Sequence, residues 1–188
     1  MRESTRVVLR LAVTAAAAFA LLLASAAAVR AAAPSPKQLL QALLQTPPAG
    51  SLPPALGGSA AKGAKLSRGA RAHHAVGAAE IGNSAALVGF LVFPTHALAV
   101  ADLKAYPPDR GPNTIVSRTP AGLPRPAYIL RAAGNGFEAA YAVFVVDNVL
   151  VDAWTYGQKG TSGQLRAIVE RDARWANAYV SSLNRGSK

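Results

Sequence analysis

The alternation of hydrophobic and polar residues predicts five strands between residue 75 and residue 156. The strands are predicted over residues 75–81, 85–93, 127–132, 138–146 and 149–156. The first two are separated by Gly82-Asn83-Ser84, and the last two by Asp147-Asn148, both of which favour hairpin turns. The second run is apolar on both faces, which is typical of a central strand. The chain is therefore expected to form an antiparallel sheet.

Two helices are predicted among these strands. Pro94 and Thr95 end the second strand and begin a helix over residues 96–106, and residues 161–184 carry apolar residues at helical spacing. Thr161 or Ser162 is the expected N-cap of the last helix. The order ββα-loop-βββα predicts an α+β fold, in which an antiparallel sheet of about five strands carries two helices packed on one face. The proline-rich stretch 109–126 is expected to be a functional or mobile loop.

A short helix is predicted ahead of this domain. Ser35 is placed as an N-cap, Pro36 at the first helical position, and the leucines of residues 39–44 form one stripe that Pro47-Pro48 ends. The following residues, 50–72, are rich in Gly, Ala, Ser and Pro and are expected to be extended or mobile. We therefore divide the chain into 1–28, a leader; 29–72, the short helix and a mobile basic linker; and 73–188, a single α+β domain.

The first 28 residues have the pattern of a secretory signal peptide. Arginines precede an apolar run from Leu11 to Leu23, and small residues suitable for cleavage follow at positions 24–28. The chain is therefore predicted to be exported and associated with the cell envelope. In the alternative interpretation the apolar segment is not cleaved and serves as an N-terminal membrane anchor. The chain has no cysteine, so neither a lipid-modified cysteine nor a disulfide is possible.

The chain is strongly basic, with a net charge of +11, and removal of residues 1–28 leaves about +9. Much of this charge lies in the segment before the domain, where Lys62, Lys65, Arg68 and Arg71 are predicted to contact an anionic envelope polymer or lipid surface. Residues 62–71 contain no aromatic side chain, which argues against nucleic acid as the partner.

The sequence shows no established catalytic or metal-binding pattern. His73 and His74 are adjacent, so they point to opposite sides of an extended chain, and the third histidine is His96. There is no G-x-S-x-G motif, and the Gly-rich turn at 134–136 lies between two strands rather than before a helix. We therefore predict no metal, no cofactor and no catalytic residue. The alternative is a secreted hydrolase-like enzyme that uses His96 or Asp152, with the proline-rich loop as a lid.

The last predicted strand supplies the candidate ligand-binding residues, Asp152, Trp154 and Tyr156. Strand alternation places them on one face and the valines of the same strand on the other. If the valine face packs under the helices, the opposite face displays an acid flanked by two aromatic rings, a pattern that often marks recognition. In the alternative interpretation Trp154 is a core residue and Asp152 lies at an exposed strand edge or pairs with an arginine.

One further acid, Asp172, lies between apolar pairs of the last helix. A carboxylate in that position needs Arg131, Arg171 or another partner on the helix to offset its desolvation, which favours a structural ion pair.

Several short segments resemble small exported bacterial α+β proteins whose role is uncharacterised. The resemblance rests on Leu52-Pro53-Pro54, Val76-Gly77-Ala78, Val92-Phe93-Pro94 and residues 147–151. Such proteins usually carry Gly at the position of Asp147 and often a cysteine pair, and this chain has neither. The resemblance implies an α+β fold and an exported location, and it implies no catalytic residues.

These observations together predict an exported, non-enzymatic binding or interaction domain. Its partner is expected to be an anionic envelope polymer or lipid surface, or an unidentified protein or small ligand. A purely structural envelope protein is the remaining alternative, and it would bind no saturable ligand.

Overall fold

A computed structural model describes residues 33–48, 50–57, 61–64, 74–105, 114–117, 122–133, 136–158 and 160–186. The predicted leader and three of the four basic contact residues, Lys65, Arg68 and Arg71, lie outside the described residues. Residues Ala33–Ser187 form one compact unit.

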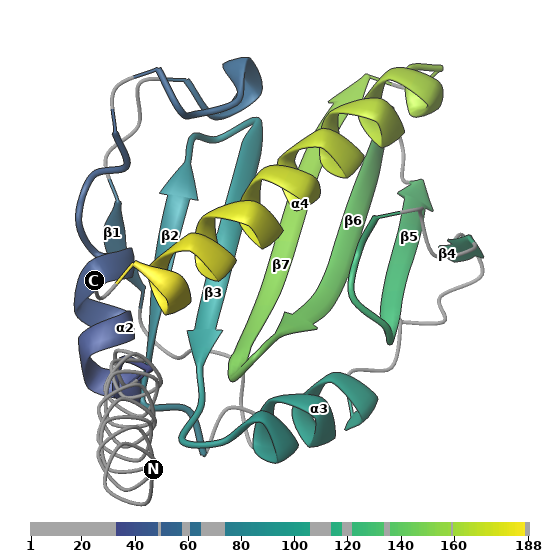
Figure 1. Ribbon diagram of the computed structural model, residues 1–188. Helices are drawn as coiled ribbons and strands as arrows, with labels where there is room; N and C mark the ends of the chain where they lie inside the picture. Colours follow the sequence, from purple (N-terminus) through teal and green to yellow (C-terminus); the bar gives the residue numbers. More distant parts are fainter. Residues whose placement is uncertain are drawn as a thin grey trace, which may run out of the picture. The chain divides into compact units, whose positions relative to one another are not determined.

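The unit is built on a single antiparallel sheet of seven strands in the order β1-β2-β3-β7-β6-β5-β4 (Figure 1). The strands are β1 Lys62–Ala64, β2 Gly77–Gly82, β3 Ala86–Val92, β4 Thr114–Ser117, β5 Ala127–Ala133, β6 Phe137–Val146 and β7 Val149–Gln158. Strands β3, β7 and β6 lie at the centre, where both edges of each strand are hydrogen-bonded. The α+β class and the antiparallel sheet predicted from the sequence are confirmed.

The sheet has two more strands than the pattern of residues predicts. The five predicted strands correspond to β2, β3, β5, β6 and β7, whereas β1 and β4 form the two edges. β1 has three residues and β4 has four, which is too short for an alternation of polar and apolar residues to be recognised. β1 is a strand because it pairs with β2, and β4 is a strand because it pairs with β5. The partner residues lie outside the short segment whose pattern could be read.

Three α-helices and one short 3₁₀ helix are found among the described residues of the unit. They are α2 Pro36–Leu43, η1 Pro54–Leu56, α3 His96–Ala105 and α4 Ser162–Arg185. The predicted start of α2 is confirmed as a capping box, in which the Gln38 backbone N–H donates to the Ser35 hydroxyl and the Ser35 N–H donates to Gln38 Oε1. Thr161 occupies the N-cap position of α4, but its hydroxyl donates to the carbonyl of Gln158 instead of accepting from the helix.

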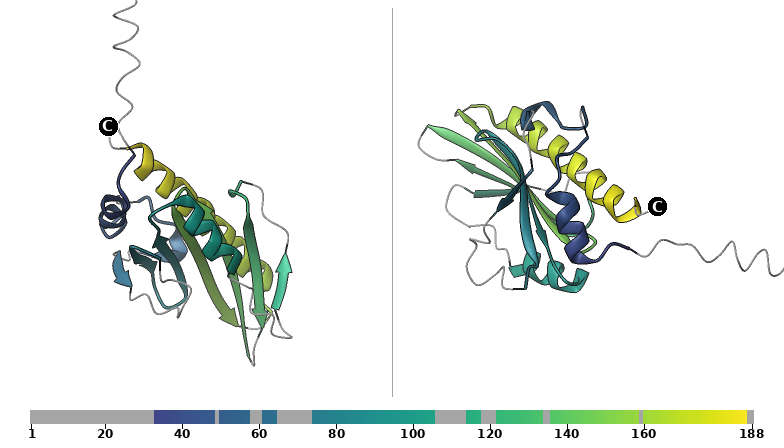
Figure 2. Two further views of the ribbon diagram at one scale, coloured as in Figure 1. Left: turned by 90° about the horizontal axis from the view of Figure 1, so that it is seen from below. Right: turned by 90° about the vertical axis from the view of Figure 1, so that its left-hand side faces the viewer.

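The main core lies between the sheet and a layer made by α4, α2 and η1. Figure 2 (right) shows α4 and α2 on the same side of the sheet. From the sheet, the core takes Ile81, Val88, Phe90, Ile129, Phe144 and Val151, and from the helices it takes Leu39, Leu43, Leu56, Leu165, Val169 and Val180. Because Leu39 and Leu43 of the predicted leucine stripe are almost fully buried, α2 is a structural part of the domain.

The third helix, α3, contacts the opposite face of the sheet from α4, which corrects the prediction that both helices share one face. Ala99 and Leu103 of α3 pack with Val143, Val145 and Leu150. In β7, Leu150 alternates with Val149 and Val151, which belong to the main core under α4. The helix lies by the β6–β7 turn and covers only that end of its face (Figure 1). The second helix on the α4 face is α2.

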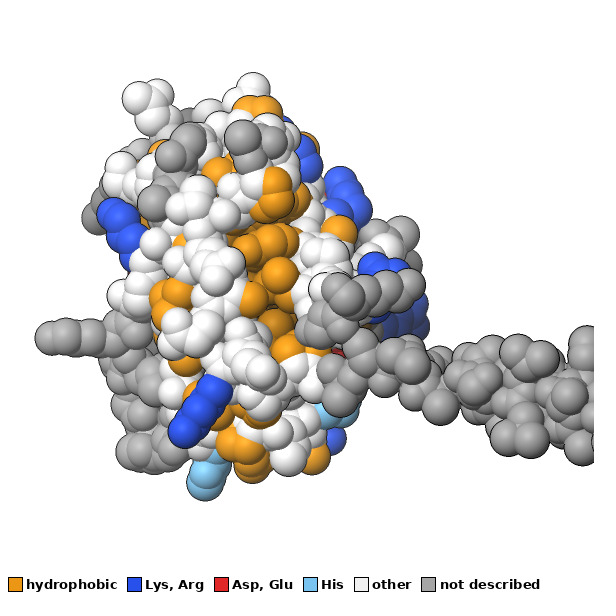
Figure 3. Space-filling view, turned by 60° about the vertical axis from the view of Figure 1, so that its left-hand side comes forward, with side chains coloured by type: hydrophobic (Ala, Val, Ile, Leu, Met, Phe, Trp, Pro, Cys, Tyr) orange, Lys and Arg blue, Asp and Glu red, His pale blue; other side chains and the backbone are white. Residues whose placement is uncertain are grey.

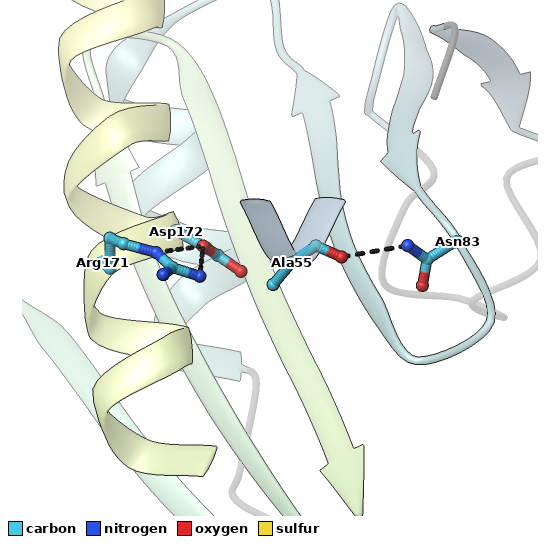
Figure 4. Close-up of polar contacts among 4 residues, drawn as sticks. All are labelled: Ala55, Asn83, Arg171 and Asp172. Atoms are coloured by element: carbon cyan, nitrogen blue, oxygen red, sulfur yellow. Dashed lines mark hydrogen bonds and ion pairs between the residues drawn. The ribbon is translucent and has the colours of Figure 1, made fainter. Parts of the chain in front are cut away.

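The predicted mobile stretch after α2 also contributes to the fold. Leu56 is fully buried in the main core, and Lys62–Ala64 pairs with β2. The Asn83 side chain, in the β2–β3 turn, donates to the carbonyl of Ala55 over 2.9 Å and ties η1 to the hairpin (Figure 4). The folded unit therefore begins well before residue 73, where we placed the boundary.

Candidate functional site

Aromatic side chains gather on the face of β6 and β7 that is turned away from α4. We call Phe137, Tyr141, Trp154 and Tyr156 the aromatic surface. Phe137 is 49% exposed and Tyr156 is 44% exposed, and within the described residues they are the large hydrophobic side chains left most open to solvent. The rings of Trp154 and Tyr156 are stacked, with centroids 5.8 Å apart and planes inclined by 16°. The surface lies on central strands, so its backbone is held on both sides.

The strand register explains why these rings meet. Tyr141 is directly opposite Trp154, and Ala139 is directly opposite Tyr156. Phe137 is two residues before Ala139 and is therefore a diagonal neighbour of Tyr156 on the same face. Sequence reasoning included Trp154 and Tyr156 but omitted Phe137, because the strand was expected to begin at Glu138. An aromatic residue directly after the Gly134-Asn135-Gly136 turn was the available signal.

The predicted division of β7 into two faces is confirmed, but Asp152 is not displayed at the surface. Val149, Val151 and Ala153 pack in the main core, and Asp152 lies on the other face with the aromatic residues. Asp152 is only 4% exposed and pairs in register with Gly89 of β3 and Val143 of β6. This central position also contradicts the alternative of an exposed strand edge. Of the three predicted ligand-binding residues, only the two rings remain accessible from solvent.

His96, the candidate of the enzyme alternative, lies in a pocket of about 460 Å³ with Thr95, Asp147 and Asn148. Its ring Nδ1 contacts the backbone carbonyl of Asp147. The Asp147 carboxylate accepts a hydrogen bond of 2.5 Å from the Asn184 side chain. The Thr95 hydroxyl accepts from the Leu98 N–H and so serves to cap α3. These contacts join the β6–β7 turn to the start of α3 and the end of α4, which is a structural arrangement.

The buried acid on α4 forms the predicted ion pair. Asp172 is 2% exposed, and its Oδ1 accepts from Arg171 Nε at 3.3 Å and Nη2 at 3.4 Å (Figure 4). Burial raises the pKa of Asp172 above its ordinary value, and the neighbouring Arg171 opposes part of that rise. Arg131 instead pairs with Glu138 of β6, with 2.9 Å between Nη2 and Oε1. Asp172 is thus explained by packing and charge pairing.

The remaining candidate residues do not converge on one site. Lys62 is exposed on the edge strand β1, opposite Glu80 of β2, and it is the member of the basic group that the structure describes. His74 is exposed, and His73 lies outside the described residues. Within the described parts of the chain, no group of three or more His, Asp or Glu side chains is placed to hold a metal ion.

Comparisons with known proteins give little further guidance. No protein-family profile matches this chain, and no curated protein matches its sequence. Among solved structures, the extracellular domain of PknH from Mycobacterium tuberculosis aligns with 19% identity and a TM-score of 0.36. The alignment covers 58% of this chain and 66% of that one, slightly less than two thirds of its length. A likeness at this level carries no argument about function. Separately, no helix among the described residues is long and apolar enough to span a membrane.

Proposed function

We propose that this chain is an exported, non-enzymatic binding domain that is held near an anionic cell envelope and recognises its partner through the aromatic surface. The observation that carries the proposal is the exposure of Phe137 and Tyr156 beside the stacked Trp154 ring. Large apolar side chains left together on a rigid surface are characteristic of recognition sites.

The physical argument rests on what a partner gains at this surface. Tyr and Trp supply large contact areas with few rotatable bonds, so they lose little conformational entropy when a partner covers them. Because Trp154 and Tyr156 are already stacked, part of that entropy is lost before binding. Truncation of a ring that is buried at such an interface typically costs about 1–4 kcal/mol, which corresponds to a loss of affinity of about fivefold or more.

Export and envelope association are supported by the sequence. The leader-like residues 1–28 precede a chain whose remaining net charge is about +9. The basic group Lys62, Lys65, Arg68 and Arg71 begins in the edge strand β1 and continues after it in the sequence, and it attracts anionic polymers or lipid headgroups at low ionic strength. Attraction of this kind raises the local concentration of the domain near the envelope and leaves specificity to the aromatic surface.

The test compares binding of the full chain to isolated envelope material at low and high salt. Tyr156→Ser and Phe137→Ser change exposed side chains, so we expect the domain to stay folded. The affinity of the saturable binding should fall by about tenfold in each variant. Gln164→Ala, at an exposed position of α4, is the matched control. Reversal of the four basic residues to Glu should instead remove the salt-dependent part of the binding. If the serine variants bind as the parent does, the aromatic surface is not the recognition site.

Two further measurements separate this proposal from its alternatives. Mass analysis of the N-terminus in medium and membrane fractions distinguishes a cleaved leader from a retained anchor, and the intact chain dissolved in the cytoplasm would contradict export. A hydrolase screen with His96→Ala and Asp152→Asn tests the enzyme alternative. An activity that is lost in either folded variant would replace the binding proposal, and the absence of any saturable ligand would favour a structural protein.

A further inference from the structure

A second surface lies on the other side of the sheet, where α2 and the residues after it face the C-terminal half of α4. A groove of about 510 Å³ runs there, and we call it the α2–α4 groove. One wall is formed by Trp175, Tyr179 and Leu183 of α4, and the opposite wall includes Ala42 and Pro48. Its volume is within the range of small-molecule sites.

The walls of the groove are largely apolar, and two of its hydroxyl groups already donate to carbonyls of the chain. The Trp175 and Tyr179 rings are stacked with centroids 5.1 Å apart and planes inclined by 12°, which makes one continuous flat wall. The Ser51 hydroxyl donates to the Pro48 carbonyl, and the Ser182 hydroxyl donates to the Tyr179 carbonyl, both over 2.7 Å. The groove therefore offers a lining that suits hydrocarbon.

The charges around the groove are positive. None of the described residues that line it is acidic. Arg171 lies one helical turn before Trp175 with its side chain 43% exposed, but its charge is already paired with the buried carboxylate of Asp172. Arg185 is exposed three residues after Ser182, and its Nε donates to the carbonyl of Ser181. Figure 3, turned so that the left-hand side of Figure 1 comes forward, shows hydrophobic side chains along the middle of this face and Lys and Arg side chains toward its margins.

From this combination we infer that the α2–α4 groove binds a single-chain anionic lipid. The hydrocarbon chain lies against Trp175, Tyr179 and Leu183, and the anionic headgroup is held by Arg185, which follows the lining residues of α4. Guanidinium groups bind phosphate and carboxylate with paired hydrogen bonds, so the headgroup is selected by charge and the chain by apolar contact. The site is on the opposite side of the sheet from the aromatic surface and does not depend on the function proposed for that surface.

The experiment measures lipid binding by the fluorescence of Trp175. The full chain has two tryptophans, so a Trp154→Phe background leaves Trp175 as the reporter. The probes are a tetradecanoyl lysophosphatidylglycerol and the lysophosphatidylcholine of the same chain length, each titrated below the concentration at which it forms micelles. We expect saturable binding of the anionic lipid and binding of the zwitterionic lipid that is several-fold weaker.

Variants separate the chain contacts from the headgroup contacts. Ala178→Phe fills the groove from an exposed position and should weaken binding by at least about tenfold, whereas Ala167→Phe, also exposed on α4 but away from the groove, should leave it unchanged. Arg185→Gln should reduce the preference for the anionic lipid by about two- to fivefold. Arg166→Gln removes the same charge from the side of α4 opposite the groove, and it should leave the preference for the anionic lipid unchanged.

Several results would overturn the inference. Equal binding by the Ala178→Phe and Ala167→Phe variants would exclude the groove, and equal affinity for the two lipids would exclude charge selection. The absence of saturable binding below the micelle concentration would exclude the site altogether. Tyr156→Ser, which tests the aromatic surface, should leave lipid affinity unchanged, so failure of one proposal is distinguishable from failure of the other.

Discussion

Replacement of Leu43 by Ala tests whether α2 is part of the cooperative domain or a tether in front of it. Leu43 is 0% exposed and belongs to the main core. The helix has eight residues, which is too short to be stable in isolation, so its structure depends on this contact.

The expected destabilisation follows from the complete burial of the side chain. Removal of a fully buried leucine side chain costs about 2–5 kcal/mol, because the transfer free energy is lost and a cavity remains. We take about 3 kcal/mol for Leu43→Ala, since α2 lies at the margin of the unit and has some freedom to move into the space. For a unit of this length each kcal/mol lowers Tm by about 2–4 °C, so Tm should fall by about 6–12 °C.

The assay is urea unfolding of the full chain, followed by far-UV circular dichroism and tryptophan fluorescence. Gln41→Ala changes an exposed residue of the same helix and should remain within about 0.5 kcal/mol of the parent. If Leu43→Ala is equally close to the parent and the m-value is unchanged, α2 does not unfold with the domain. In that case residues 29–72 would be a helix and linker ahead of the domain, as the sequence predicts, and our account of the core would be refuted.

Two other substitutions test single groups. Burial raises the folded-state pKa of Asp172, so its contribution to stability is lost as pH rises above the ordinary value of about 4. Chemical denaturation should therefore show that the free energy of unfolding of Asp172→Asn rises relative to that of the parent between pH 4 and pH 7. The opposite trend would contradict a raised pKa for Asp172. Asp147 has a φ of 51°. Asp147→Ala should be less stable than Asp147→Gly by about 1 kcal/mol, because Ala is strained there; equal melting temperatures would argue against this.

The two proposed surfaces make different demands on the molecule. The aromatic surface lies on central strands and suits an extended or macromolecular partner. The α2–α4 groove is concave and depends on the contact between α2 and α4, which Leu43→Ala would disturb. We therefore expect lipid binding to weaken in that variant before binding at the aromatic surface is affected.

The sequence by itself determined the elements whose signals are local. The Ser35 N-cap, the Asp147-Asn148 turn and the alternation of β7 were all predicted and are present in the structure. Each depends on hydrogen bonds or side-chain directions within a few residues, so the pattern of residue types is sufficient to identify it. The antiparallel sheet could also be predicted, because short turns join consecutive strands of the pattern.

The tertiary structure decided the edges of the sheet, the placement of α3 and the accessibility of the candidate site. β1 and β4 are strands because they pair with distant residues, and α3 covers the other face because Val143, Val145 and Leu150 are apolar there. Asp152 was predicted on the correct face of β7, but its burial depends on what surrounds that face. Alternation fixes the direction of a side chain, whereas exposure is fixed by neighbours that come from elsewhere in the chain.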